Sequence, residues 1–161
     1  MALFVIYPKR IKNTTKKQEL IFASAGLCGI TLYYLIENIA LTYTTASNVG
    51  VIISVSPLFI AILSGIISKE STKLNSSFFI GFAVAMAGIY IISFGTSKFE
   101  MNPAGDILAV IAAIIWAVYS LLSKKISSFG FNTIQNTRRI FTYGILFMIP
   151  LPVSYTHLTL P

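Results

Sequence analysis

Residues 20–43 read LIFASAGLCGITLYYLIENIALTY, and Glu37 is the only charged residue among them. The hydrocarbon core of a bilayer is crossed by a helix of about 20 mostly apolar residues. This stretch meets that requirement, and its apolar residues form a continuous block instead of one face of a helix. We therefore predict that residues 20–43 form a membrane-spanning helix.

The rest of the chain repeats this pattern of long apolar blocks. Hydrophobic residues make up 55% of the sequence and charged residues only 11%, whereas a soluble domain carries about 25% charged residues. Closely spaced blocks with short connections predict an all-α fold, a polytopic bundle of transmembrane helices. The further blocks are residues 48–68, 78–94, 107–123 and 140–153, and residues 1–8 have the character of the end of another span.

Basic residues alternate between successive connections. Lys plus Arg number five before the first full span and then zero, two, one and four in the following connections. This alternation is what the positive-inside rule predicts for helices that cross the membrane back and forth. We predict an inner (plasma) membrane protein with residues 9–19, 69–77 and 124–139 on the cytoplasmic side. The net charge of +7 is then a topology signal, and no nucleic-acid partner is expected.

Glu37 is the first candidate functional residue, because a carboxylate inside a membrane span is costly and usually marks a substrate, ion or proton pathway. Tyr33 and Tyr34 precede it by four and three residues and share its helix face, and Asn38 adjoins it. In the functional interpretation Glu37 lines a cavity, where it binds a cationic or amine group or exchanges a proton. In the structural interpretation it is a neutral carboxyl group bonded to a neighbouring helix, or it reaches the outer interface. We favour the cavity.

Pro57 lies in the middle of the second span. Its ring crowds the carbonyl of Ile53 and it has no N–H to donate, so it predicts a kink. The hydroxyl groups of Ser54 and Ser56 are placed to satisfy the freed backbone groups. Such a kink suits a transport path or a hinge, and it is equally compatible with a purely structural bend.

Trp116 and Tyr119 lie three residues apart on one face of the span 107–123. They either line a cavity opposite Glu37 or pack against the alanines around them. Two other patterns indicate structure alone. Asn102 and the proline after it are typical of a helix start, and the small residues Gly81, Ala85 and Gly88 predict a close helix–helix contact.

Four short motifs follow one another along the chain: ALTYTTAS at residues 40–47, SPLF at 56–59, GDILA at 105–109 and WAVYS at 116–120. This order resembles the EamA-type proteins of the drug/metabolite transporter superfamily, and the resemblance covers about residues 1–152. It implies ten helices in two inverted five-helix repeats, with both chain ends in the cytoplasm. Inverted repeats place the substrate near the membrane midplane, between the two halves.

The resemblance also implies how the chain is divided. Residues 1–97 correspond to the end of helix two and helices three to five of the first repeat, and residues 98–153 to helices six and seven of the second. We expect residues 154–161 to be a non-native tail, so His157 receives no functional weight. We further expect a chain incomplete at both ends that does not transport on its own.

The predicted function is that of a secondary transporter for a small metabolite, an amino-acid-like solute or a drug, with proton coupling left open. The expected partners are this small-molecule substrate and the lipid bilayer, and a homodimer is left open. No cofactor or metal is expected, and the single cysteine, Cys28, excludes a disulfide framework. The five acidic residues are scattered, which disfavours a membrane enzyme. The alternative is a non-transporting membrane assembly or partner protein made of packed helices.

Overall fold

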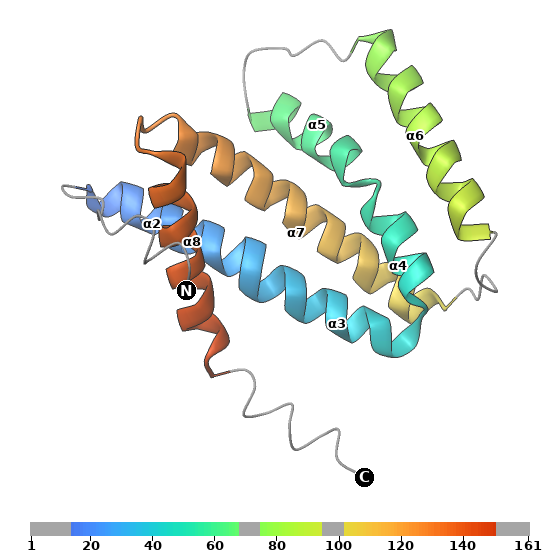
Figure 1. The fold of residues 1–161 in the computed structure, drawn as a ribbon, viewed down its shortest axis with the longest axis horizontal. Helices are drawn as coiled ribbons and strands as arrows, with labels where there is room; N and C mark the ends of the chain where they lie inside the picture. The colour runs from blue at the N-terminus through green and yellow to red at the C-terminus, as the bar shows by residue number, and fades with distance from the viewer. Residues whose placement is uncertain (1–13, 68–74, 95–101, 151–161) are drawn as a thin grey trace. The chain divides into compact units, whose positions relative to one another are not determined.

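The computed structural model describes residues 14–67, 75–94 and 102–150, with side chains placed up to residue 92 in the middle segment (Figure 1). Every regular element in these three segments is helical, which confirms the all-α prediction. The predictions for residues 1–8 and 154–161, and for most of the connections around residues 69–74 and 98–101, lie outside the described residues.

The first predicted span is continuously helical from Lys16 to Tyr43. It consists of α2 (Lys16–Gly26), the π-helix η1 (Leu27–Leu32) and α3 (Tyr33–Tyr43). Thr15 and Gln18 cap its beginning reciprocally, each side chain accepting a hydrogen bond from the other's backbone N–H. The π-helical segment is a feature that the sequence analysis did not predict.

The second span is broken where Pro57 predicts a kink. It consists of α4 (Ala46–Ile53) and α5 (Ser56–Ile67), separated by a turn at residues 54–55. The Ser56 hydroxyl donates to the Ile53 carbonyl, the group that residue 57 would reach if it had an N–H. The predicted kink and the role of this serine are therefore confirmed.

Replacing Pro57 by alanine is expected to straighten this helix, because an N–H at position 57 can donate to the Ile53 carbonyl. Spin labels at the exposed positions Gly50 and Ile66 should then move toward the spacing of about 24 Å that sixteen residues of straight helix give. Pulsed electron paramagnetic resonance measures this distance, and Leu58→Ala is the control. An unchanged distance in Pro57→Ala would show that the proline does not cause the break.

The remaining helices are α6 (Ser76–Phe94), α7 (Pro103–Ser127) and α8 (Thr133–Met148). Asn102 starts α7 as predicted, its Oδ1 accepting a hydrogen bond from the backbone N–H of Ala104 at 3.1 Å. The block predicted at residues 140–153 is shifted. Its helix begins at Thr133, because Asn132 caps it through a 2.9 Å hydrogen bond from the backbone N–H of Ile134.

This shift corrects the predicted cytoplasmic connection 124–139, since Arg138 and Arg139 lie in a helix and not in a loop. Arg138 is buried, with 8% of its surface exposed. The basic residues that were counted toward a loop therefore belong partly to the packed structure.

Three of the helical segments are long and apolar enough to cross a membrane: Lys16–Tyr43, Ala46–Ile67 and Pro103–Ser127. Ser76–Ile92 is a shorter apolar helix. The close contact predicted at Gly81 and Gly88 is absent from the described part of the chain, where a Cβ atom at either glycine would meet no atom within 4 Å.

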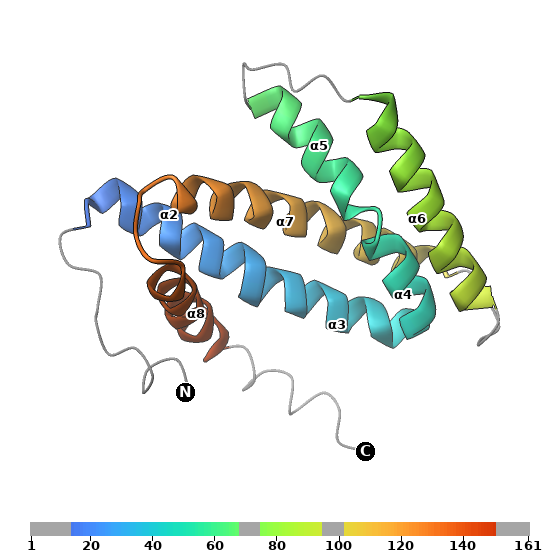
Figure 2. The same cartoon turned by 45° about the horizontal axis from the view of Figure 1, so that its top comes forward.

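The chain divides into two compact units. Unit 1 comprises residues up to Leu32 together with those from Tyr119 onward, and unit 2 comprises Tyr33–Val118. In unit 1, α8 crosses α2 and η1 (Figures 1 and 2) and encloses a core of Phe22, Ala25, Ile30, Ile126 and Ile140. Unit 2 has a smaller core of Ala40, Val49 and Ala109, which joins α3, α4 and α7.

Candidate functional site

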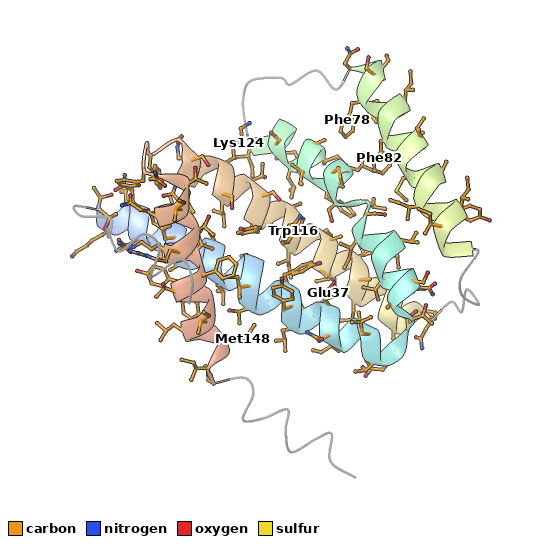
Figure 3. The ribbon with its side chains drawn as sticks, in the orientation of Figure 1. Glu37, Phe78, Phe82, Trp116, Lys124 and Met148 are labelled. Carbon is orange, nitrogen blue, oxygen red and sulfur yellow. The ribbon has the colours of Figure 1, made fainter. Side chains whose placement is uncertain are left out.

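Three of the predicted site residues lie together in unit 2: Tyr33 and Glu37 on α3, and Trp116 on α7. The Tyr33 hydroxyl donates a hydrogen bond to Oε1 of Glu37 at 3.2 Å. The ring centroid of Tyr33 lies 4.9 Å from that of Trp116, with 50° between the ring planes. Figure 3 shows Glu37 and Trp116 on these two neighbouring helices. We call these three residues the Glu37 group.

Small residues surround Trp116 along α7. Ala112, Ala113 and Ala117, on the turns around Trp116, are fully buried, so the backbone of α7 lies within a packed region. At the beginning of α7, a Cβ at Gly105 would lie 2.8 Å from the Cβ of Thr44, which marks a close approach to the end of α3. Trp116 thus lies among buried alanines along its own helix and contacts the ring of Tyr33. That it lines a cavity opposite Glu37 stays a prediction.

Tyr34 and Asn38 are more exposed than the Glu37 group. Tyr34 is 47% exposed, and its ring centroid lies 5.2 Å from that of Tyr33. The side-chain amide of Asn38 donates to the backbone carbonyl of Tyr34 at 2.7 Å, within its own helix. Asn38 thus extends the polar strip along α3 but directs its amide group to the backbone.

The other predicted residues make their contacts elsewhere. Ser54, at the break between α4 and α5, donates to the Val51 carbonyl and lies 3.6 Å from the sulfur of Met86 on α6. Pro57 is exposed at the same break. Tyr119 belongs to unit 1, where its ring packs directly against Gly29 of η1. Of the eight predicted site residues, the structure therefore joins Tyr33, Glu37 and Trp116 through side-chain contacts, with Tyr34 beside them.

The Glu37 group combines one carboxylate with aromatic rings. Aromatic faces attract cations through their quadrupole, and a nearby carboxylate adds a full opposite charge. In the described segments, no group of three or more His, Cys, Asp or Glu side chains is arranged to hold a metal ion. The arrangement is suited to an organic cation or an amine.

A second polar group lies in unit 1 and was not predicted. The carboxylate of Glu19, at the start of α2, is bonded to Arg139 and Tyr143 of α8. The sequence analysis placed Glu19 and Arg139 in predicted cytoplasmic connections, residues 9–19 and 124–139. No local pattern could have paired them, because the two residues are 120 positions apart in the chain.

Comparison with known proteins agrees with this fold. The profile of the EamA-like transporter family matches residues 1–94. An uncharacterized transporter of Archaeoglobus fulgidus is 29% identical over 153 residues, which cover 93% of this chain and 51% of that protein. The uncharacterized transporter YetK of Bacillus subtilis is 27% identical over 154 residues, covering 93% and 46% respectively. The chain thus spans about half the length of these curated relatives.

A solved protein structure has the same fold. Its TM-score is 0.67 at 19% sequence identity, over 90% of this chain and 51% of the other. At this level of identity the likeness supports the helical architecture alone.

Proposed function

Because this chain belongs to the EamA-like transporter family, we propose that it forms part of a secondary transporter that carries a small amine-bearing solute across the inner membrane. The family and the relatives named as transporters point to a transporter rather than an enzyme. The solute is a small metabolite, an amino-acid-like molecule or a drug whose cationic group binds at Glu37.

The observation that carries this proposal is the Glu37 group itself. Glu37 lies six residues before the end of α3 at Tyr43, about 9 Å along the helix axis, and so within the apolar span. An ionisable residue at such a position serves function by default. Tyr33 orients the carboxylate through its hydroxyl, and the tilted, packed rings of Tyr33 and Trp116 supply an apolar wall for the carbon skeleton of the solute.

Proton coupling follows from the chemistry of one carboxylate. In the proposed cycle, Glu37 binds either a proton or the ammonium group of the solute, and not both at once. Arrival of an ammonium group displaces that proton, so one positive charge leaves as one enters. Exchange at this single group makes the transport electroneutral, with one proton moved against one cation.

The binding step is tested with the fluorescence of Trp116, the only tryptophan of this chain. The protein is expressed at the full length of its reading frame in nanodiscs and titrated with 2-phenylethylammonium. The matched probe is 3-phenylpropionate, which has a similar size and an opposite charge. We expect a saturable change with the cation and none with the anion, because only the cation complements Glu37.

Trp116→Phe identifies the part of the signal that comes from this tryptophan. Equal responses to both probes, or no response to either, would contradict binding of an amine at the Glu37 group.

A further inference from the structure

The bonds around Glu19 tie the beginning of the first span to α8. Arg139 donates from Nε to Oε2 of Glu19 at 3.1 Å and from its terminal nitrogen to Oε1. The Tyr143 hydroxyl donates to Oε2 at 2.6 Å. Two parallel bonds from a guanidinium to a carboxylate form the strong, directional kind of ion pair. We call Glu19, Arg139 and Tyr143 the Glu19 cluster.

The Glu19 cluster is only partly shielded from water. The side chain of Arg139 is 29% exposed and that of Glu19 is 25% exposed. On its inner side, the guanidinium carbon of Arg139 lies 5.9 Å from the ring centroid of Phe22, which is fully buried. The cluster therefore sits where a packed core meets the surface, and water can replace its hydrogen bonds when the helices separate.

Further along the same pair of helices, the contact is tight and buried. A Cβ at Gly26 would lie 2.7 Å from the backbone nitrogen of Gly144. The hydroxyl of Thr31, which is 3% exposed, donates to the Gly144 carbonyl at 3.1 Å. This part of α2 continues into the π-helical segment η1, and π-helical turns occur frequently at functional sites. The helices thus have a fixed crossing point and a polar contact at one end.

The Glu19 cluster joins a helix of the first proposed repeat to a helix of the second. The span that contains Glu19 corresponds to the first repeat and α8 to the second, and both helices begin at the end predicted to face the cytoplasm. Transporters with inverted repeats work largely by moving one repeat against the other, which opens one side at a time. A breakable bond between the repeats at one end is what such a movement requires.

We propose that the Glu19 cluster is a latch that holds the cytoplasmic end of the transport pathway closed. This inference rests on the proposed function. The latch is closed in the present structure and opens when α8 pivots about the crossing at Gly26 and Gly144. Opening exposes the inner surface of η1 to the cytoplasm.

Cys28 provides a built-in probe for this movement. It is the only cysteine of this chain and lies in η1, partly buried, on the segment that α8 contacts. The measurement is the rate at which a water-soluble maleimide labels Cys28 in nanodiscs, with any cysteine outside this chain replaced by serine. Glu19→Gln and Arg139→Gln should each raise the rate about tenfold, equivalent to about 1.4 kcal/mol.

Matched variants separate a latch from general loosening. Lys124→Gln removes a charge from an exposed side chain of α7 (Figure 3) and should leave the rate unchanged. The swap of Glu19→Arg with Arg139→Glu should restore most of the protection. Tyr143→Phe removes one of the donors while it keeps the ring, so a smaller rise is expected even if the arginine variants do not fold.

Substrate dependence distinguishes a latch from a static brace. The probe 2-phenylethylammonium should change the labelling rate of the wild-type protein and leave that of Glu19→Gln unchanged. The latch is wrong if Glu19→Gln is labelled at the same rate as Lys124→Gln, or if the probe binds at Trp116 without altering the wild-type rate. Neither result would change the binding measured by the fluorescence of Trp116. The latch can therefore be wrong while the proposed function stands.

Discussion

Replacing Glu37 by glutamine, in the protein expressed at the full length of its reading frame, is expected to lower the initial uptake of 2-phenylethylammonium into proteoliposomes at least about thirtyfold. Glutamine keeps the size of the side chain and an oxygen that can accept the hydrogen bond from Tyr33. It removes the charge that balances the ammonium group. Loss of one partner of a buried, hydrogen-bonded charge pair costs about 2–5 kcal/mol, and 2 kcal/mol is a factor of about thirty in affinity.

The matched control for this prediction is Thr42→Val on the same helix. The Thr42 hydroxyl is exposed and donates to the Ile39 carbonyl of its own helix at 2.7 Å, so its loss should leave uptake unchanged. Membrane insertion of both variants is checked by yield and by size-exclusion chromatography. Uptake by Glu37→Gln at the wild-type rate would remove Glu37 from the pathway.

Among all the substitutions proposed, replacing Gly26 by alanine is expected to lower the free energy of unfolding most. The new Cβ would lie 2.7 Å from the Gly144 nitrogen and the Ile140 carbonyl oxygen, and 2.8 Å from the Cβ of Tyr143. Two of these atoms belong to the backbone of α8, so relief requires the whole helix to move. Overpacking of this kind typically costs about 1–3 kcal/mol and occasionally more.

Gly81→Ala is the matched control for this substitution. It makes the same change in the middle of α6, where the new Cβ would meet no described atom within 4 Å. Alanine favours a helix over glycine by about 1 kcal/mol, so this variant should be neutral or slightly stabilised. The thermal unfolding midpoint in detergent compares the two. A Gly26→Ala protein as stable as Gly81→Ala would contradict the tight crossing of α2 and α8.

The sequence was sufficient to predict most of the helices. Apolar blocks of membrane-spanning length located the helices, Pro57 located the break between α4 and α5, and Asn102 located the start of α7. These features are local, because each depends on hydrophobicity or on the backbone chemistry of a single residue. Local signals of this kind are readable without knowledge of the tertiary structure.

Two features of the fold were missed for different reasons. The π-helical segment η1 has no residue type that marks it, and it appears where α8 and Tyr119 pack against Gly29 and Ile30. The early start of α8 was readable, since Asn132 is a good N-cap residue. The predicted start at residue 140 was drawn from hydrophobicity alone, so the amphipathic first half of α8 was assigned to the preceding loop.

The candidate site was predictable only within one helix. The contact between Tyr33 and Glu37 follows from a spacing of four residues. The contact of Tyr33 with Trp116 depends on how α3 and α7 pack, which hydrophobicity does not specify. The ion pair of Glu19 with Arg139 was missed for the same reason: it depends on how two helices from opposite ends of the described chain pack together.

Solute counterflow is the most direct test of the central claim that the protein is a carrier with an amine site at Glu37. Proteoliposomes with the wild-type protein, expressed at the full length of its reading frame, are loaded with unlabelled 2-phenylethylammonium and diluted into a trace of the labelled compound. We predict a transient accumulation of label above its equilibrium level, which a carrier that alternates between two sides produces. Label that only equilibrates, as fast as in vesicles without protein, would contradict the account.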